Sequence, residues 1–419
     1  MNKRSWRITL YSCLLYLLAP FVLARLLIRG RSQPGYLKFP QQRFGYGYPK
    51  VNAPIIWIHA VSVGETRGSL PLVEALKQLY PTHTLLLTHM TAAGWDTGQG
   101  LLGNRVIQCW LPYDLPGACR RFLSHFSPHA GLLLETEIWF NLINYAQQIH
   151  TPIFLVNARL SESSLNKYKH FKRLSCEALL SLHGIIAQSH DDAARFKQLG
   201  AADICVAGNI KFDISPPDDI QDLIDHFRSL IGNRRIWLAA STREGEEKII
   251  LNIAKQLPEG ILTIIVPRHP QRFSEVAHLI KSSGFRMQQR NDKDEVEPST
   301  QIWLGNSMGE MYGYYGISDL ALIGGSLLPF GGQNLIEAAA VGTPTLVGAY
   351  TFNFSQVVQD AIKAGATIQV SNTDEFVPLI TELFNTPNKL HKMQIAAKNF
   401  TRNHMGATNR IMKYIQERL

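Results

Sequence analysis

The sequence predicts an α/β protein made of two doubly wound, Rossmann-like domains that follow an apolar N-terminal helix. From Pro54 onward, short apolar runs alternate with amphipathic segments, which is typical of parallel sheets covered by helices. An acidic stretch with two prolines at 213–219 interrupts this alternation and predicts a linker. A run of 17 uncharged residues between Arg7 and Arg25 predicts the N-terminal helix.

The composition is that of a folded protein with substantial cores. Of the 419 residues, 45% are hydrophobic and 18% are charged, which excludes a disordered chain, a collagen-like repeat and a simple coiled coil. The five cysteines form no CxxC pair, so neither a disulfide framework nor a zinc ribbon is indicated. This cysteine usage fits a reducing compartment.

The net charge of +9 is concentrated at the N-terminus. Residues 1–31 contain no acid and six basic residues, namely Lys3, Arg4, Arg7, Arg25, Arg29 and Arg31. This leaves a net charge of +3 for the other 388 residues. A basic surface over the whole molecule is therefore excluded, and we expect no nucleic-acid partner.

Residues 1–31 are expected to form a single-helix membrane anchor. The uncharged run is just long enough to span a bilayer if the flanking arginines extend toward the headgroups. Basic residues on both sides favour the cytoplasmic face of an anionic inner membrane. Two alternatives remain: Val22-Leu23-Ala24 resembles a signal-peptide cleavage site, and an amphipathic helix could lie in the membrane interface instead.

The alternating pattern divides into two halves. The first domain is expected at 32–212, with strands at 55–61, 84–88, 105–111, 130–134, 152–157, 184–187 and 203–207 and helices at 69–79, 139–149 and 164–181. The second is expected at 220–419, after the linker at 213–219, with strands near 235–240, 261–266, 285–288, 301–304, 319–323, 344–347 and 366–370. Such sheets bind ligands beyond the carboxyl ends of their strands, so two facing domains predict a site in an interdomain cleft.

Several common cofactor motifs are missing from the sequence. No GxGxxG follows a strand and no GxxxxGK[ST] occurs, which argues against a dinucleotide dehydrogenase and a P-loop enzyme. HExxH and metal-spaced Cys/His sets are also missing, and Asp292-Lys293-Asp294 is better explained as a solvated loop. We therefore expect neither a metal nor a cofactor.

Candidate catalytic residues follow strands of the first half. Glu65 comes after the first strand, near the start of a helix, where its carboxylate could accept a proton, although the helix dipole also favours a first-turn Glu. Glu135 and Glu137 follow another strand. Two carboxylates so close together repel each other and cost stability, which indicates a functional role. Glu137 could simply cap the next helix, so Glu135 is the sharper candidate. Lys211 lies beside the linker and is a weak signal by itself, because a single lysine is usually solvated.

The second half carries groups suited to an anion. The stretch 241–247 follows a strand and is expected to form an N-cap cluster that could bind phosphate, or only a capping box. Arg268 ends the next strand and offers a planar fork for phosphate, unless it is a surface arginine held between prolines. The glycine-rich stretches 324–327 and 331–337 can cradle a phosphate with backbone amides, while Glu337 could bind ribose hydroxyls.

These motifs together resemble the Kdo (3-deoxy-D-manno-octulosonic acid) transferases. The matching stretches, in order, are HAVSVGE (59–65), ETEIW (135–139), NARLSE (157–162), GNIKFD (208–213), STREGEE (241–247), PRHPQR (267–272), MGE (308–310), GGSL (324–327), GGQNLIE (331–337) and TFNF (351–354). The resemblance implies the GT-B glycosyltransferase architecture and a membrane-associated N-terminus. The chain departs from the family at Arg243, where a His is usual, and at Ala338, where a Pro is frequent.

The resemblance also implies the reaction and its residues. Kdo would pass from CMP-Kdo to the lipid A precursor (lipid IVA) with inversion, with Glu65 as general base and with Glu135 and Lys211 stabilising the transition state. The implied CMP site comprises Pro267, Arg268, Met308, Gly309, Glu310, Asn334, Leu335, Ile336 and Glu337. Two alternatives remain open: another GT-B enzyme, such as a UDP-sugar transferase or epimerase, and a membrane-tethered nucleotide-binding module without catalysis.

Overall fold

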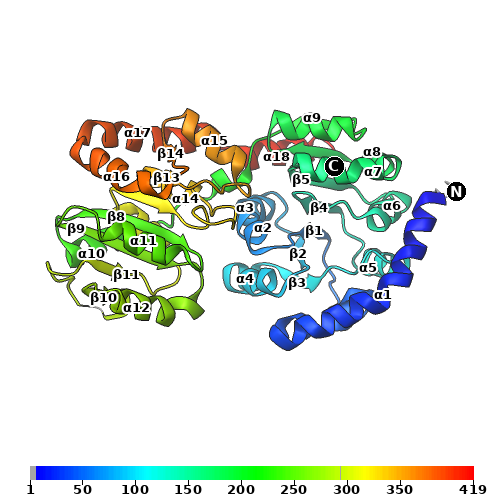
Figure 1. The fold of residues 1–419 in the computed structure, drawn as a ribbon. Coiled ribbons are helices and arrows are strands. Elements are labelled where there is room, and N and C mark those ends of the chain that lie inside the picture. Colours follow the sequence, from blue (N-terminus) through cyan, green and yellow to red (C-terminus); the bar gives the residue numbers. More distant parts are fainter. Residues whose placement is uncertain (1–5, 293) are drawn as a thin grey trace. The chain divides into compact units, whose positions relative to one another are not determined.

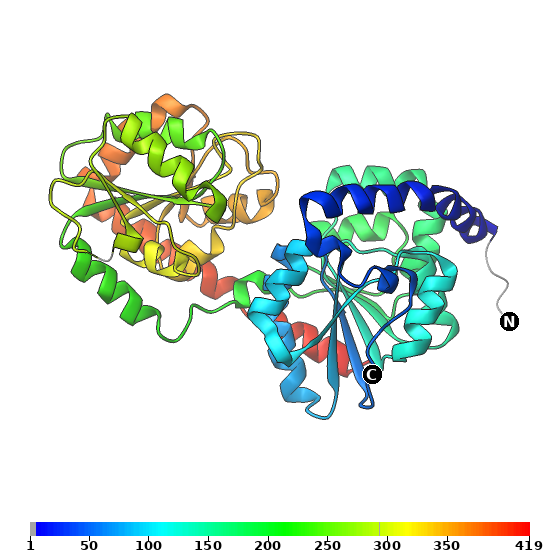
Figure 2. The ribbon, with the colours of Figure 1, turned by 90° about the horizontal axis from the view of Figure 1, so that it is seen from below.

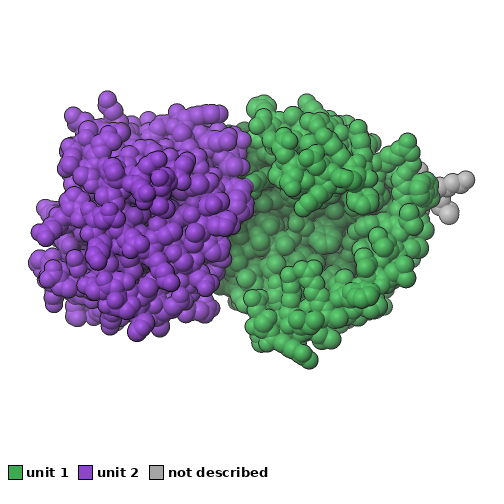
Figure 3. All heavy atoms as spheres, in the orientation of Figure 1, with its two compact units in different colours: residues 1–214, 405–419 green, residues 215–404 purple. Residues whose placement is uncertain are grey.

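The chain folds into two compact units. The computed structural model describes residues 6–292 and 294–419, so Lys3, Arg4 and Lys293 of the segments discussed above lie outside the described residues. Unit 1 comprises Met1–Ile214 together with Met405–Leu419, and unit 2 comprises Ser215–His404 (Figure 3).

Unit 1 is built on a seven-stranded parallel sheet (Figure 1). Its strands are β1 (Ile55–His59), β2 (Thr84–His89), β3 (Ile107–Trp110), β4 (Ala130–Leu134), β5 (Ile153–Ala158), β6 (Gly184–Ala187) and β7 (Ile204–Val206), in the order β3-β2-β1-β4-β5-β6-β7. β1 and β4 are buried along their whole lengths, because helices cover both faces of the sheet. This explains why parallel strands read as continuous apolar runs.

The helices of unit 1 largely follow the predicted segments. They are α1 (Trp6–Ser32), α2 (Val63–Gly68), α3 (Leu70–Leu79), α4 (Ala92–Leu102), α5 (Pro116–Phe126), α6 (Phe140–Gln148), α7 (Glu162–His170), α8 (Lys172–Leu180), α9 (His190–Gln198) and α18 (Ala407–Gln416), with 3-10 turns η1 (Pro34–Leu37), η2 (Pro40–Phe44), η3 (Gly103–Arg105) and η4 (Ile210–Asp213). The single helix expected at 164–181 is wrong. It divides at Phe171, whose backbone leaves the helical conformation, and this lets α7 and α8 pack separately.

The C-terminal helix belongs to unit 1, and here the structure differs from the expected domain at 220–419. Ile411 and Ile415 of α18 lie in the apolar core beside α3. The Asp213 carboxylate accepts hydrogen bonds from the N–H groups of Gly406 (2.6 Å) and Thr408 (2.5 Å) and so fixes the start of α18. An amphipathic sequence predicts a helix that covers a sheet, but it does not say which sheet.

Unit 2 repeats the architecture. Its strands are β8 (Arg235–Thr242), β9 (Ile261–Pro267), β10 (Met287–Gln289), β11 (Ile302–Leu304), β12 (Leu320–Ile323), β13 (Thr345–Val347) and β14 (Thr367–Gln369), in the parallel order β10-β11-β9-β8-β12-β13-β14. Its helices are α10 (Ile220–Ile231), α11 (Glu246–Ala254), α12 (Phe273–Ser282), α13 (Met311–Ile317), α14 (Ile336–Ala340), α15 (Ser355–Lys363), α16 (Phe376–Asn385) and α17 (Pro387–His404), with 3-10 turns η5 (Pro270–Arg272), η6 (Arg290–Asp292) and η7 (Thr373–Glu375). The predicted α/β class with two doubly wound sheets is confirmed.

The strand order of each sheet reverses direction at one point. In unit 1 this point lies between β1 and β4, and in unit 2 it lies between β8 and β12. Loops that leave neighbouring parallel strands in opposite directions open a crevice at their carboxyl ends, where ligands of this class of fold bind. The loops that follow β1, β4, β8 and β12 are therefore the places to search for a site.

Candidate functional site

The turn from β1 into α2 holds Glu65. Ser62 is the N-cap of α2, and its hydroxyl oxygen accepts a hydrogen bond from the Glu65 backbone N–H. In return, Glu65 Oε1 accepts from Ser62 Oγ and Oε2 accepts from the Val61 N–H, both at 2.8 Å. The carboxylate is thereby fixed at the carboxyl end of β1 by groups of its own turn.

Glu65 is a carboxylate whose proton affinity is tuned. Burial and, next, the negative charge of Glu135 raise its pKa to about 8, against the hydrogen bonds from Val61 and Ser62, which lower it. A carboxyl group with a pKa close to neutral is suited to general acid–base work, because it is available as a base and still holds a proton well once it has taken one.

An ion pair stands next to this carboxylate. Glu135 directly follows β4, and its Oε1 lies 2.7 Å from the Nζ of Lys211, with both side chains about four-fifths buried. Lys211 comes from η4, where the Asn209 side chain accepts its backbone N–H, and the lysine stem passes over Gly68 of α2. The structure thus brings together Glu65, Glu135 and Lys211 from three separate segments.

The backbone at Glu135 is unusual. Its φ of 59° lies in the left-handed region, which is costly for a residue with a Cβ, and its N–H donates to the Val156 carbonyl at 3.0 Å. Strained conformations of this kind concentrate at functional sites. The alternative that Glu137 caps the next helix is wrong, because its side chain makes no cap hydrogen bond to α6. Its Oε2 instead accepts a hydrogen bond from Trp139 Nε1 at 2.8 Å.

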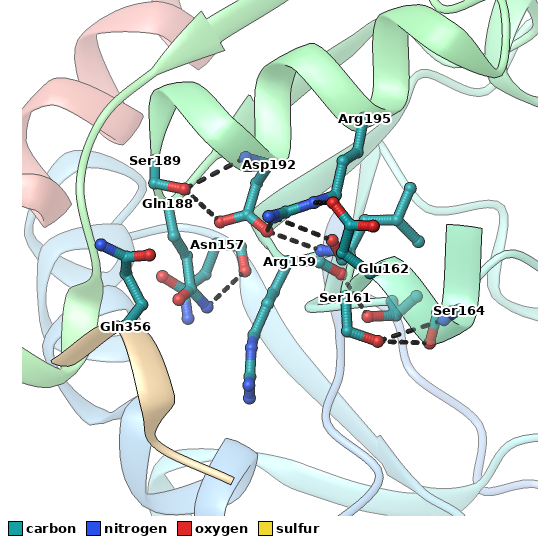
Figure 4. A network of polar contacts seen from close by, with 12 residues as sticks. Asn157, Arg159, Ser161, Glu162, Ser164, Gln188, Ser189, Asp192, Arg195 and Gln356 are labelled. Carbon is teal, nitrogen blue, oxygen red and sulfur yellow. Dashed lines mark hydrogen bonds and ion pairs between the residues drawn. The ribbon is translucent and has the colours of Figure 1, made fainter. Parts of the chain in front are cut away.

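The loop after β5 is fixed by a network around Asp192 (Figure 4). Asp192 Oδ1 accepts from the Leu160 N–H at 2.8 Å, and Arg195 lies within ion-pair distance of both Asp192 and Glu162. The Thr136 hydroxyl donates to the Arg159 carbonyl and so links this loop to the one that carries Glu135. The stretch 157–162 therefore supports the site.

Arginines gather where β8 and β9 of unit 2 end. The three are Arg243, Arg268 and Arg272. Arg268 directly follows Pro267, the buried last residue of β9, and Arg243 Nη1 lies 2.9 Å from His269 Nε2. Burial, and then the charges of these three arginines, lower the pKa of His269. The histidine is therefore neutral at pH 7, and the positive charge of this edge comes from arginine.

The expected N-cap cluster at 241–247 is different in the structure. α11 begins at Glu246 after Gly245, and no side chain of the described residues caps it. Instead the buried Glu246 carboxylate accepts from the N–H groups of Arg243, Gly325 and Leu327 at 2.7–2.9 Å, which ties the β8 loop to the glycine-rich loop. These amides are occupied by a carboxylate of the chain itself, so this stretch acts as a clamp between loops.

Glu247 and Arg272 form a second clamp. Arg272 donates two hydrogen bonds to the Glu247 carboxylate (2.6 and 3.1 Å), and Thr242 Oγ1 donates a third at 2.6 Å. The Glu247 side chain is only 1% exposed. Of the three arginines, Arg272 is thus committed to holding η5 against α11.

The stretch 308–310 joins β11 to α13. Met308 is 60% exposed, and Gly309 has a φ of 84°, which favours glycine. Glu310 Oε1 lies 3.0 Å from Arg290 Nη2, while its Oε2 is buried and has no hydrogen-bond partner in the described part of the chain. Glu310 is therefore held by Arg290 through one oxygen, and its other oxygen is an unsatisfied acceptor closed to solvent.

The glycine-rich loop leads into α14 through Asn334 to Glu337. Leu335 and Ile336 are 1% and 2% exposed, so their side chains pack inside unit 2. Asn334 Oδ1 accepts from the Ile336 N–H at 3.0 Å. The charges of Glu337 and Arg268 both act on the Tyr315 hydroxyl, so these two predicted residues face a common region of unit 2.

The comparisons with known proteins decide the family. Residues 39–214 match the family described as 3-deoxy-D-manno-octulosonic-acid transferase (kdotransferase), and residues 282–400 match the glycosyl transferases group 1. A 3-deoxy-D-manno-octulosonic acid transferase of Bordetella pertussis is 38% identical over 97% of this chain and 98% of its own, and one of Haemophilus influenzae is 33% identical over 98% of both. The chain belongs to the Kdo transferase family.

The resemblance noted from the motifs is thereby confirmed, and the chain is a glycosyltransferase of GT-B architecture. The crystal structure of UDP-GlcNAc 2-epimerase from Neisseria meningitidis covers 87% of this chain with a TM-score of 0.59 at 16% identity. This likeness shows the fold alone. Among the described residues, no group of three or more His, Cys, Asp or Glu side chains could hold a metal ion.

The motifs of the Kdo transferase did not reveal the partners of its site residues. Three such pairs lie at increasing distances along the chain. Ser62 and Glu65 are 3 positions apart, Arg290 and Glu310 are 20 apart, and Glu247 and Arg272 are 25 apart. Only the Ser62 pair had a local signal, since a Ser followed three residues later by Glu is the pattern of a capping box.

Proposed function

We propose that this chain transfers Kdo from CMP-Kdo to the lipid A precursor, lipid IVA, with inversion at the anomeric carbon and at the cytoplasmic face of the inner membrane. The observation that carries the proposal is Glu65, a partly buried carboxylate with a pKa of about 8 beside the Glu135–Lys211 ion pair. The family relationship supports the sugar that is transferred.

In the proposed reaction, Glu65 is the general base. It takes the proton of an acceptor hydroxyl as the oxygen forms a bond to the anomeric carbon of Kdo. The bond between that carbon and the phosphate oxygen breaks, and CMP leaves with the electron pair on the opposite face. One displacement of this kind inverts the configuration at the carbon.

Glu135 and Lys211 stabilise the charges of this step. Lys211 brings a cation next to Glu135, and this ion pair fixes the ammonium group where the Kdo carboxylate or the developing charge can meet it. Glu135 in turn keeps Glu65 basic through its negative charge. The carboxylate and the lysine therefore act on the reaction together.

The donor is assigned to unit 2. Arg268 supplies a cation for the single phosphate of CMP, and Gly309, which has open space where a side chain would be, supplies a backbone amide. Asn334, Leu335 and Ile336 complete the CMP site at the start of α14. Glu337 can accept hydrogen bonds from the ribose, and Glu310, which is paired with Arg290, completes this side of the CMP site. Pro267 and Met308 would complete the CMP site by contact. The positive charge of Arg268 would stabilise the negative charge of the CMP leaving group, which carries one phosphate.

The test is turnover of defined donors by the purified full-length chain. With CMP-Kdo and detergent-dispersed lipid IVA, mass spectrometry should detect an acceptor heavier by one or more Kdo residues, and UDP-sugars should give no product. Glu65→Gln should lower turnover by ~10²–10⁴-fold and leave CMP affinity nearly unchanged. Near-normal turnover of Glu65→Gln would refute the role of the base, and transfer from a UDP-sugar would refute the donor.

A further inference from the structure

We propose that α1 lies in the plane of the membrane instead of crossing it, with one apolar face in a single leaflet and the opposite face against unit 1. By length and composition, α1 is the one helix among the described residues that could cross a membrane. Its contacts point to the in-plane arrangement. The part of the inference that concerns delivery of the acceptor rests on the proposed function; the position of α1 does not.

The N-terminal half of α1 is bound to unit 1 by polar groups. The Tyr11 hydroxyl donates to Asp114 Oδ2 at 3.0 Å, and Ser12 Oγ donates to Asn141 Oδ1 at 2.9 Å. Asp114 is fully buried and also accepts the N–H of Asn141. Burial raises the pKa of Asp114 to about 6, and its hydrogen bonds oppose the shift. Such a network is costly to break, because Asp114 would lose a partner in a buried place.

The C-terminal half of α1 is bound by apolar packing. Leu26 forms a small buried cluster with Tyr36 of η1 and Ala92 of α4. Gly30 lies directly against the side chain of Leu37, where a Cβ would collide. Figures 1 and 2 show α1, in dark blue, running along the body of unit 1. Contacts with one folded unit therefore occur near both ends of the helix.

This spacing is incompatible with a helix that spans the bilayer. The buried positions of α1 extend from Ile8 to Gly30, and 22 residues of helix rise about 33 Å. The hydrocarbon core of a bilayer is about 30 Å thick. A spanning α1 would either break one set of contacts or draw the polar loops of unit 1 into the hydrocarbon, where unpaired polar groups are very costly.

The face of α1 turned away from unit 1 is a continuous apolar stripe. Its members are Trp6, Leu10, Leu14, Leu17, Phe21 and Ile28, which are 53–73% exposed. They recur every three, four or seven residues, so they share one side of the helix. Ile8, Ser12, Leu26 and Gly30 recur in the same manner on the buried side. An exposed apolar stripe of this length on a water-soluble unit marks a surface that is covered by something else.

Basic groups beside the stripe select an anionic lipid surface as the cover. Arg25, Arg29 and Arg31 are exposed at the C-terminal end of α1. At its N-terminal end, Arg7 pairs with Glu177 of α8 at 2.9 Å, so α8, which starts at the α7–α8 junction, contacts the helix. That junction presents Phe171, 66% exposed, among the exposed basic residues Lys167, Lys169, Lys172 and Arg173. Apolar side chains bordered by cations are typical of helices bound at a membrane interface.

The position of α1 relates the membrane to the candidate site. The partners of α1 in the sheet loops are Ala92, Asp114 and Asn141, which follow the carboxyl ends of β2, β3 and β4. Glu65 and Glu135 follow the carboxyl ends of β1 and β4, at the same edge of the same sheet. The leaflet that receives the stripe therefore lies at the edge of unit 1 that carries the proposed base. A lipid acceptor could reach Glu65 with its acyl chains still in that leaflet.

Depth measurements with spin labels test the arrangement directly. Labels would be attached to Leu10→Cys, Leu17→Cys and Ile28→Cys, each in a Cys13→Ser background, on the full chain bound to phosphatidylethanolamine–phosphatidylglycerol vesicles. All three labels should lie at one depth, ~5–10 Å below the headgroups. A spanning helix would instead place Leu17 about 10 Å or more deeper than Leu10. Such a gradient, or labels that all remain in water, would overturn the proposal. A label at Thr82→Cys, an exposed position before β2 at the opposite edge of unit 1, is the control that should stay in water.

A charge variant supplies the second measurement. Leu17→Glu/Phe21→Glu should reduce the fraction of protein that floats with these vesicles by roughly tenfold or more, because it puts two carboxylates into the apolar stripe. The matched control, Gln256→Glu/Ser282→Glu, adds the same charge to exposed positions of unit 2 and should float like the unaltered chain. Flotation of the stripe variant at the control level would overturn the proposal. Neither vesicle measurement needs turnover, so an inactive enzyme would count against the proposed function and not against this position of α1.

Discussion

Replacing Glu65 by glutamine should make the folded protein more stable while it removes activity. Burial and the neighbouring charge of Glu135 raise the Glu65 pKa from 4.5 to about 8. Between these two pH values the unfolded chain releases the Glu65 proton and the folded chain retains it, so the free energy of unfolding falls as the pH rises. The shift of about 3.5 units corresponds to ~5 kcal/mol lost once the pH is above 8.

Glutamine at position 65 cannot ionise and escapes this loss. It keeps one acceptor oxygen, so one of the two hydrogen bonds from Val61 and Ser62 is lost, which costs ~1 kcal/mol. The expected net gain is about 3–4 kcal/mol at pH 8, and no gain at pH 4.5 or below. For a unit of this size, ~1 kcal/mol shifts Tm by 2–4 °C, so the transition of unit 1 should move upward by roughly 6–16 °C at pH 8.

Calorimetry of both proteins at pH 5, 6, 7 and 8 measures this difference. Glu74→Gln is the matched control, because Glu74 is a half-exposed residue of α3 whose ion pair with Arg105 lies at the surface. Its effect should stay within about 0.5 kcal/mol at every pH. A Tm difference for Glu65→Gln that does not grow between pH 5 and pH 8 would refute the raised pKa of Glu65 in the folded protein.

Three further predictions concern pH, the ion pair and the donor groups. Because Glu65 must be ionised to act as a base, kcat/KM should rise with pH toward an apparent pKa near 8, and Glu135→Gln should move that midpoint to lower pH; an unchanged midpoint would contradict their coupling. Lys211→Met should lower turnover at least ~10-fold with CMP affinity unchanged in calorimetry, and Lys211→Arg should recover part of the turnover, whereas an active Lys211→Met would remove the lysine from the mechanism. Arg268→Ala and Glu337→Ala should each weaken CMP-Kdo binding by ~1.5–3 kcal/mol, and unaltered titrations of both would place the donor elsewhere.

Much of the fold could be predicted because parallel strands are buried on both faces. Ile55–His59 and Ala130–Leu134 read as apolar runs for that reason, and each is followed by the polar motif that its carboxyl end exposes. Strand direction alone then places Glu65 and Glu135 at the same edge. The motif that contains Glu65 also predicts its local geometry, since Ser62 and Glu65 have the spacing of a helix cap.

What sequence alone could not determine depends on contacts between distant segments. Three features are of this kind: the break of 164–181 at Phe171, the attachment of α18 to unit 1, and the pairing of Arg290 with Glu310. In each of them, the local sequence is compatible with several packing partners and does not indicate which one is used. The left-handed backbone at Glu135 is also invisible in the sequence, because nothing about a glutamate predicts that conformation.

The N-terminal helix shows most clearly what the sequence indicates and what only the tertiary structure decides. Hydropathy and flanking arginines predict that α1 meets a membrane, because an uncharged run of this length is long and apolar enough to do so. They leave its orientation open, since a spanning helix, a signal peptide and an interfacial helix can share one composition. Only the tertiary contacts of Tyr11, Ser12, Leu26 and Gly30 separate a buried stripe from an exposed one. The physical reason is that composition sets how much of a helix is apolar, whereas its partners set which side of that helix is left for lipid.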